Sequence, residues 1–237
     1  MDPSEYASMD AAEHRLWWYR ALHVRLIEAL GLHEGRVLDA GCGTGGLLAR
    51  LRANRPHLNV VGLEWSTFAA TRAAAKSAAT IVRGSVNAMP FAGATFDAAI
   101  AADVLCHAAV DPHTALGELR RVLRPGGLLV INMPAYQWLL SAHDRRVHNA
   151  RRLTARQTAR LLQDAGFTRI RTRYWNGLLL PVMAAQRKLL PRKDAASDVA
   201  PLSPWLDATL HGMTEIERRL PFALPFGSSV LATAECP

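Results

Sequence analysis

A glycine-rich turn directly after a short apolar strand limits the fold of this chain more than any other feature. Residues 37–46 have the sequence VLDAGCGTGG, and a helix is predicted over 44–54. Glycine adopts left-handed backbone angles without steric cost and lets a ligand lie against bare backbone. The free N–H groups at the start of the next helix favour a carboxylate or a phosphate. The pattern therefore predicts a ligand crevice at the carboxyl end of the first strand of an open α/β sheet.

Short apolar runs alternate with helical patterns over most of the chain. A helix is predicted over 11–30, capped by Asp10 and ended by Gly31. Later strands alternate with helices of 10–15 residues, which predicts a mainly parallel, Rossmann-like sheet with helices on both faces. Strands are predicted at 36–39, 59–63, 79–82, 95–101, 128–132 and 168–175, and helices at 44–54, 67–78, 112–123 and 154–165.

Residues 176–225 break this alternation. The segment is rich in proline and holds two apolar-basic stretches, 178–190 and 206–220, before a last predicted strand at 228–234. We therefore expect a single domain over residues 1–237, with 176–225 inserted between the last two strands as a lid or a dimer contact. A monomer and a homodimer are both compatible with the sequence.

Charge and composition bear on the partners of the chain. The formal net charge of +8 suggests nucleic acid, but the basic residues are 25 Arg and only 3 Lys in an alanine-rich chain. This imbalance is typical of a compositional bias of the source genome. We therefore expect most arginines to be solvated and do not favour a nucleic-acid partner.

The cysteines and the apolar runs bear on location. Cys42, Cys106 and Cys236 are far apart and odd in number, which predicts neither a disulfide framework nor a zinc site. No run of about 18 apolar residues could span a bilayer, and the polar, acidic start of the chain does not resemble a signal peptide. We expect a cytoplasmic protein, in which the basic end of 178–190 leaves peripheral membrane contact open.

Two acidic residues flank the glycine turn. Asp39, two residues before Gly41, suits an ammonium group and would repel a pyrophosphate. Glu64 ends the second predicted strand, where its carboxylate can accept both hydroxyls of a ribose. Gly41, Gly43 and Gly46 also satisfy the dinucleotide pattern G-x-G-x-x-G, so the turn alone is ambiguous. Asp39 favours an adenosine-type ligand that carries an ammonium group.

Residues 37–134 resemble the class I S-adenosylmethionine-dependent methyltransferases, specifically their broad small-molecule subfamily. The matching segments are 37–46, 60–64, 84–91, 95–97, 102–107 and 122–127. The order and spacing of these segments together are specific, although no single one is. The resemblance implies a seven-stranded sheet of order 3-2-1-4-5-7-6 with an antiparallel last strand. It also implies S-adenosyl-L-methionine as cofactor and S-adenosyl-L-homocysteine as its product.

The resemblance further implies cofactor-binding positions. Gly41 and its neighbours would pass under the methionine moiety, and Glu64 would hold the ribose. Ser85 stands where many relatives have Asp, so its contact with the adenine amino group would lack charge assistance. Trp65 would stack on adenine, unless it is a half-buried core residue. The predicted cofactor-binding residues are Asp39, Gly41, Cys42, Gly43, Glu64, Trp65, Ser85, Val86, Ala102 and Asp103.

Residues 13–20, EHRLWWYR, resemble the lid helix of a bacterial branch of this family, so residues 1–31 are predicted to form an N-terminal lid. Adjacent tryptophans on a helix point about 100° apart and cannot both face one core stripe. Trp18 and Tyr19 are therefore candidate substrate-binding residues that also cover the cofactor. Simple packing is the alternative.

Methyl transfer mainly requires alignment and exclusion of water, and a base where the acceptor carries a proton. His107 follows the fourth strand, where a family histidine often faces the methyl group, and is a candidate base; a packing histidine is the alternative. After the fifth strand, His143 is a second catalytic candidate, and Tyr136 and His148 are candidate substrate-binding residues. His143, Asp144 and His148 offer no evident fourth ligand, so no metal is expected.

The expected activity is methyl transfer to an O, N or C atom of a small, partly apolar metabolite. Such an acceptor would be a natural product or a lipid-like or quinone-like compound of bacterial secondary metabolism. RNA methylation, guided by nine arginines between 145 and 173, is the alternative within enzymes, and a non-catalytic S-adenosylmethionine-binding protein is another. Residues 103–106, DVLC, match neither Asn/Asp-Pro-Pro-Tyr nor Pro-Cys, which disfavours methylation of a base.

Overall fold

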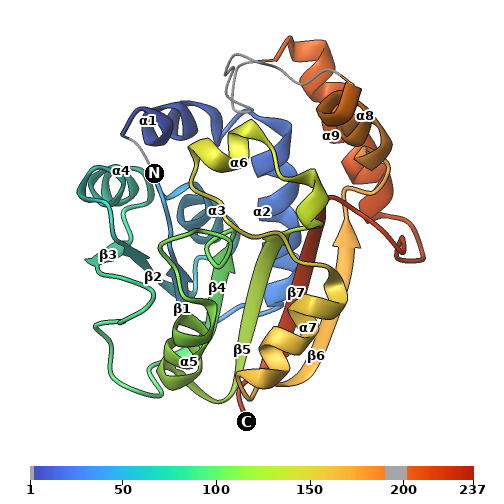
Figure 1. Ribbon diagram of the computed structural model, residues 1–237. Helices are drawn as coiled ribbons and strands as arrows, with labels where there is room; N and C mark the ends of the chain where they lie inside the picture. The colour runs from blue at the N-terminus through green and yellow to red at the C-terminus, as the bar shows by residue number, and fades with distance from the viewer. Residues whose placement is uncertain (1–2, 190–201) are drawn as a thin grey trace.

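The computed structural model describes residues 3–189 and 202–237. Its centre is a seven-stranded sheet of order β3-β2-β1-β4-β5-β7-β6, in which β7 runs antiparallel to both neighbours (Figure 1). The predicted order and the antiparallel last strand are confirmed. The strands are β1 Gly35–Ala40, β2 Leu58–Glu64, β3 Thr80–Arg83, β4 Phe96–Ala102, β5 Leu123–Pro134, β6 Thr168–Trp175 and β7 Ser229–Glu235.

Helices cover both faces of this sheet. One face is packed by α2, α3 and α4, and the other by α5 and α7 (Figure 1). Two further helices, α8 and α9, stand beside the carboxyl end of β6 (Figure 1). The helices are α1 Pro3–Ala12, α2 Trp17–Leu30, α3 Gly46–Asn54, α4 Thr67–Ser77, α5 Pro112–Val122, α6 Ala142–Arg146, α7 Ala155–Asp164, α8 Leu180–Leu189 and α9 Pro204–Arg218, with a 3-10 turn η1 at Gln137–Leu139.

The sheet separates two hydrophobic cores because alternate side chains of a strand point to opposite faces. In β4, Ala98 and Ile100 join the core under α2 and α3, whereas Ala99 and Ala101 join the core under α5 and α7. Both sets are buried, which explains why residues 98–102 of β4 form a continuous apolar run instead of an alternating one. The parallel strands all end at one edge, and the loops at this edge carry the predicted site.

The N-terminal region differs from the single helix predicted over 11–30. Helices α1 and α2 are separate and are joined by residues 13–16. Leu16 precedes α2 with an extended backbone and no side-chain cap, and Asp10 forms an ion pair with Lys76 instead of capping a helix. The break lets the Glu13 carboxylate reach the start of α3, where two groups of the glycine turn donate to it.

The segment predicted as an insertion holds α8 and α9. Residues 190–201 lie outside the described residues, so of the predicted stretch 178–190 only its last residue is left out. Asp207 of α9 binds the Arg20 guanidinium (2.6 Å) and the Trp17 N–H (2.7 Å), which joins α9 to the start of α2. Among the described residues, no helix has the length and apolar character that crossing a membrane requires.

Glu217 anchors the start of this segment to α9. Its buried carboxylate accepts hydrogen bonds from the N–H groups of Asn176 (2.6 Å), Gly177 (2.7 Å) and Leu178 (3.0 Å). These three residues lie between β6 and α8, so one carboxylate is the hydrogen-bond acceptor for three consecutive backbone N–H groups of this connection. Burial makes such an arrangement costly to break because the donors then lose their acceptor.

We expect Glu217→Ala to lower the free energy of unfolding by about 3–5 kcal/mol, because three buried donors lose their acceptor. Urea unfolding followed by circular dichroism measures this loss. Glu215→Ala is the matched control on the same helix, since Glu215 pairs with the partly exposed Arg218 and should cost less than about 1 kcal/mol. Equal losses in the two variants would contradict the anchoring role of Glu217.

Candidate functional site

The glycine turn is held between three segments at the carboxyl edge of the sheet. Gly41, Gly43 and Gly45 have left-handed φ angles of 87°, 53° and 88°. The Gly41 N–H donates to Leu63 O in β2 (2.8 Å). A Cβ on Gly41 would lie 2.5 Å from a methyl carbon of Val104, just after β4. Only glycine fits these positions, as the sequence predicted.

Glu64 lies directly against this turn. Its side chain is buried, and Oε2 accepts a hydrogen bond from the Gly43 N–H (3.0 Å). Oε1 accepts from the Ser66 N–H (2.8 Å) and from the Tyr6 hydroxyl (3.2 Å). Burial raises the pKa of Glu64, and these hydrogen bonds act in the opposite direction. The predicted ribose anchor and the glycine turn are therefore in contact, although a residue of α1 is bound there as well.

Asp39 places a buried carboxyl group beneath the turn. Asp39 is only 2% exposed, and its Oδ2 has no hydrogen-bond partner among the described residues. Burial, with the nearby carboxylates of Glu64 and Glu13, raises the pKa of Asp39 to about 8. An unpartnered buried carboxylate oxygen is costly, and a bound ammonium group would satisfy it. The residues present thus fit the amino end of the expected cofactor.

Residues of α1 and of the loop after it cover the turn. The Glu13 carboxylate accepts hydrogen bonds from Thr44 Oγ1 (2.8 Å) and from the Gly46 N–H (3.2 Å) at the start of α3. A Cβ on Gly43 would lie 2.8 Å from the terminal methyl group of Met9. The N-terminal segment is thus in direct contact with the predicted cofactor site.

Sequence reasoning missed these three N-terminal contacts. Tyr6, Met9 and Glu13 are spaced i, i+3 and i+7, which places them on one helical face. This spacing was the only signal that could have found them. It does not by itself tell what the face packs against.

On the predicted adenine side, one aromatic ring is exposed and one hydroxyl group already has a hydrogen-bond partner. Trp65 is 73% exposed, which contradicts the alternative of a half-buried core residue and leaves its ring free for a ligand. The Ser85 hydroxyl accepts a hydrogen bond from the Asn87 N–H (3.1 Å), and Val86 is buried. Ser85 therefore helps to shape its own turn.

The predicted methionine end is organised by a relay of polar side chains. Asp103 directly follows Ala102, the last residue of β4, and has a left-handed φ of 54°. Asp103 Oδ1 accepts from the Asn132 amide (2.8 Å), and Asn132 Oδ1 accepts from the Trp175 indole N–H (2.8 Å). Burial raises the pKa of Asp103 to about 7. This carboxyl group can therefore hold or release a proton near neutral pH.

The two candidate lid residues of α2 behave differently. Trp18 stacks on Trp175, with ring centroids 4.7 Å apart and planes 21° apart. Tyr19 lies near the carboxylates of Glu13 and Asp103, and burial together with these charges raises the pKa of its hydroxyl. Tyr19 therefore lies close to the predicted site, whereas Trp18 packs against Trp175, whose indole N–H donates to Asn132.

His107 has a defined orientation in the loop after β4. Its Nδ1 lies 3.1 Å from the Val147 carbonyl oxygen. Because a carbonyl can only accept, Nδ1 carries the proton and Nε2 keeps its lone pair. Burial lowers the pKa of His107, so the ring is neutral near pH 7. This tautomer is the one that a general base using Nε2 requires.

The remaining acceptor-side candidates differ in exposure and in contacts. His143 on α6 is half-buried, and its Nδ1 has no partner among the described residues. His148 is exposed. Tyr136 stacks on Tyr174 and on Trp138, with centroids 5.5 and 5.7 Å apart. Among the described residues, no hydrogen bond or ring contact joins these three side chains to one another.

Several arginines of the predicted basic stretch are used inside the protein. Arg152 is buried and pairs with Asp144 (2.7 Å). Arg151 donates to three carbonyl oxygens of the loop after β4, at 2.8 to 2.9 Å. Arg146 pairs with Glu5 of α1 (3.5 Å). These arginines support the loops of the site and do not form an open basic surface.

The thiols near the site are packing groups. Cys42 and Cys106 are both buried, and burial raises the pKa of each thiol. The Cys42 N–H donates to Leu63 O (3.0 Å), so Cys42 contributes its backbone to the turn. Neither thiol has the lowered pKa of a cysteine nucleophile.

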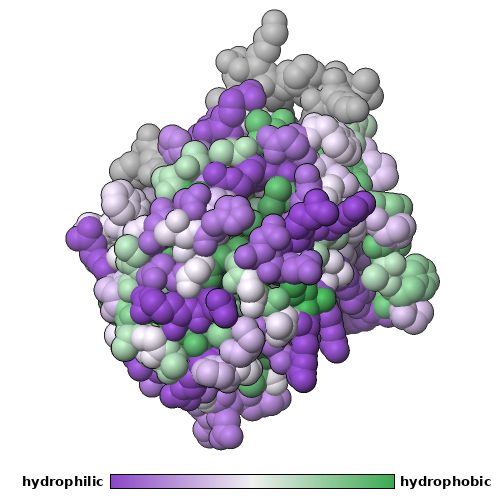
Figure 2. All heavy atoms as spheres, turned by 60° about the horizontal axis from the view of Figure 1, so that its bottom comes forward, coloured by the Kyte–Doolittle hydropathy of each residue, from purple (hydrophilic) through white to green (hydrophobic). Residues whose placement is uncertain are grey.

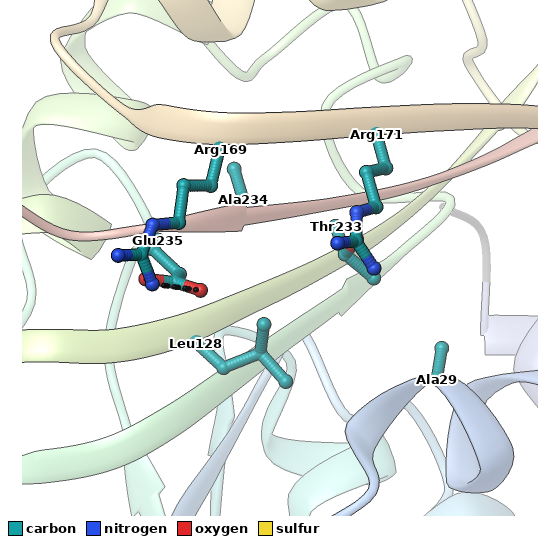
Figure 3. Close-up of a pocket in the computed structure, with 7 residues that line it drawn as sticks. All are labelled: Ala29, Leu128, Arg169, Arg171, Thr233, Ala234 and Glu235. Atoms are coloured by element: carbon teal, nitrogen blue, oxygen red, sulfur yellow. Dashed lines mark hydrogen bonds and ion pairs between the residues drawn. The ribbon is translucent and has the colours of Figure 1, made fainter.

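A cavity of about 180 Å³ lies at the opposite, amino-terminal edge of the sheet. Figure 3 shows the side chain of Arg169 beside Glu235, to which it is paired (3.0 Å), and that of Arg171 beside Thr233, with Leu128 of β5 on the other side of the cavity. The lower face of the molecule is mainly hydrophilic, with hydrophobic side chains in small separate areas (Figure 2). None of the residues that line this cavity belongs to the glycine turn or is Asp39 or Glu64, so the cavity is separate from the predicted site.

Comparison with known proteins agrees with this geometry. Residues 38–131 match the family described as "Methyltransferase domain". The O-methyltransferase resE of Aspergillus sclerotiorum is 37% identical over 137 residues, which cover 55% of this chain and 49% of resE. The 24-methylenesterol C-methyltransferase 2 of Oryza sativa subsp. japonica is 36% identical over 114 residues, which cover 45% of this chain and 30% of that enzyme.

The whole fold also has solved counterparts. The methyltransferase in complex with the Haloferax volcanii Trm112 methyltransferase activator superposes with a TM-score of 0.67 at 22% identity, covering 99% of this chain and 95% of that one. The matches to resE and to the rice sterol enzyme span half or less of those relatives. Sheet order, glycine turn and family match together identify this chain as carrying a class I, S-adenosylmethionine-dependent methyltransferase domain.

Proposed function

We propose that the protein transfers a methyl group from S-adenosyl-L-methionine to an O, N or C atom of a small, partly apolar metabolite. One observation carries this proposal: Asp39 has an unpartnered buried oxygen beside a glycine turn whose other side is bordered by Glu64. Asp39 would take the ammonium group of the cofactor, and Glu64 would take the ribose hydroxyls. Trp65 would cover the adenine with its exposed ring.

The bound cofactor supplies a methyl group that is already activated at a sulfonium centre, so the protein mainly orients the reactants and excludes water. Tyr19 would line the acceptor side, and the Trp18–Trp175 stack would support the Asp103–Asn132 pair from behind. His107 Nε2 would take the proton of an O–H or N–H acceptor, and Asp103 is a second group that can hold a proton there.

The acceptor class rests on two kinds of support. The relatives reported above bear the names of a sterol C-methyltransferase and an O-methyltransferase, which favours a natural product or a lipid-like or quinone-like acceptor. The internal use of Arg146, Arg151 and Arg152 weighs against an RNA-binding surface. Three free, buried cysteines are compatible with a reducing, cytoplasmic setting.

The proposal is tested by measuring S-adenosyl-L-homocysteine formation by mass spectrometry, with a panel of phenols, hydroquinones, sterols, amines and total RNA as acceptors. We expect product with a small apolar acceptor and none with RNA. Glu64→Ala should abolish product at micromolar cofactor, because the ribose loses one or two charge-assisted hydrogen bonds. Cofactor binding without product from any acceptor would favour the non-catalytic alternative, and product with RNA alone would favour the RNA alternative.

Replacing His107 with alanine is expected to lower kcat about 100-fold while the Kd for S-adenosyl-L-homocysteine changes less than about twofold, because a base acts only in the chemical step. Since burial lowers the pKa of His107, protonation of this ring should not limit the wild-type kcat above about pH 6.5. His113→Ala, on an exposed side chain of α5, is the control. Equal kcat in wild type and His107→Ala would remove His107 from the chemistry.

A further inference from the structure

One short segment of the chain contacts three separate parts of the cofactor site. The Tyr6 hydroxyl donates to Glu64 Oε1 (3.2 Å), which is the predicted ribose anchor. The Met9 methyl group lies against the bare backbone of Gly43. The Glu13 carboxylate accepts from two donors at the start of α3. Each of these contacts uses a feature that the glycine turn offers to a ligand.

The three side chains carry the chemical groups of the expected ligand. Tyr6 presents a hydroxyl to a carboxylate, as a ribose would. Met9 presents a thioether to the glycine backbone. Glu13 presents a carboxylate to a helix N-terminus, where a carboxylate is favoured. Tyr6 and Glu13 are both buried, so these contacts exclude water from the turn.

We propose that residues 6–13 act as an internal competitor that occupies the site of an adenosyl amino acid and must leave before this ligand can bind. This inference rests on the proposed function of the glycine turn. The ribose hydroxyls and Tyr6 cannot both use Glu64 Oε1, which also accepts the Ser66 N–H. The ligand carboxylate and Glu13 likewise compete for the start of α3.

Ion pairs at both ends hold the competing segment in place. Lys76 of α4 pairs with Glu13 and with Asp10, and Arg146 of α6 pairs with Glu5 (3.5 Å). Helix α2 begins after residues 14–16, and its contacts with Asp207 of α9 involve no residue of α1. The segment can therefore move as a unit while α2 and the sheet stay in place.

The proposal predicts the sign of a binding change. If only a fraction of molecules has the segment displaced, the apparent affinity for the ligand is reduced by that fraction. Tyr6→Phe removes the hydrogen bond to Glu64 and weakens the competitor without adding a group to the site. A lid that closes over a bound ligand predicts the opposite, because Tyr6 would then help to hold the ligand.

The test is isothermal titration of the full chain with S-adenosyl-L-homocysteine. We expect Tyr6→Phe to bind about three- to tenfold more tightly than wild type, since a hydrogen bond to a carboxylate is lost only from the occluded state. Tyr174→Phe is the matched control. The Tyr174 hydroxyl, on β6 and away from the turn, accepts from the Ala155 N–H, so the affinity of this variant should equal that of wild type.

Lys76→Met is a second variant, which removes the ion pairs with Asp10 and Glu13 and keeps the Tyr6 hydroxyl. It should also bind more tightly, and hydrogen exchange of residues 3–12 should speed up when S-adenosyl-L-homocysteine saturates the wild-type protein. Equal or weaker binding by Tyr6→Phe, with residues 3–12 more protected in the complex, would overturn the inference and leave the proposed function standing. Failure of wild type and both variants to bind would overturn the proposed function and the inference together.

Discussion

Asp39→Asn is expected to stabilise the free protein at about pH 8 by about 2–4 kcal/mol and to weaken binding of S-adenosyl-L-homocysteine at least tenfold. Asp39 is buried with an unpartnered oxygen between two other carboxylates, and asparagine removes its negative charge at similar size. The expected cofactor loses an ion pair with its ammonium group in the same step. Stability and binding should therefore change in opposite directions.

The pH dependence of this effect follows from the raised pKa. Burial raises the pKa of Asp39 to about 8, above its ordinary value near 4. The stability contributed by the protonated carboxyl group is full below pH 4 and is lost as the pH rises through 8. The advantage of Asp39→Asn over wild type should therefore grow between about pH 5 and pH 8, as measured by urea unfolding at a series of pH values.

Asp97→Asn is the matched control at the other end of the sheet. The Asp97 carboxylate accepts from the Arg36 N–H (2.7 Å) and pairs with Arg124, so its removal should destabilise the protein and leave ligand binding unchanged. If Asp39→Asn destabilises the free protein at pH 8 as Asp97→Asn does, Asp39 has a partner that offsets its burial. The assignment of its unpartnered oxygen to a ligand would then be wrong.

Gly45→Ala is expected to lower the free energy of unfolding by about 3–5 kcal/mol or to prevent folding. Gly45 has a φ of 88°, and a Cβ there would lie 2.7 Å from Ala73 Cα in α4. A left-handed angle costs an alanine about 1–2 kcal/mol, and contact with backbone adds to this because α4 cannot shift without disturbing its packing on α3. Thermal and urea unfolding measure the loss.

Gly126→Ala separates the two causes. Gly126 has a φ of 78°, but no atom lies within 4 Å of the place that an alanine methyl group would take there. Only the backbone strain applies, so the cost should be about 1–2 kcal/mol. A Gly45→Ala variant as stable as Gly126→Ala would show that α4 is not in close contact with the turn. The position of the turn relative to α4 would then need revision.

The residues near β1 and β2 illustrate what could be predicted from sequence. The glycine turn follows β1 and Glu64 ends β2, and these two strands pair in parallel. Their carboxyl ends therefore lie side by side, which brings Glu64 against the turn. The sequence places Trp65 directly after β2 but cannot tell an exposed ring from a half-buried core residue, because exposure depends on neighbours that are distant in sequence. His107 could likewise be located, whereas its tautomer depends on Val147, 40 residues away.

The amino-acid sequence by itself determined the glycine turn, the acidic residues on both sides of it and, through the family resemblance, the sheet order, because these depend on local backbone preferences and on strand order. Only the tertiary structure decided that the predicted helix over 11–30 divides in two and that Tyr6, Met9 and Glu13 cover the turn. The physical reason is that the position of the buried Glu13 carboxylate depends on hydrogen-bond donors 31 and 33 residues away. The local spacing of apolar residues does not predict such long-range contacts.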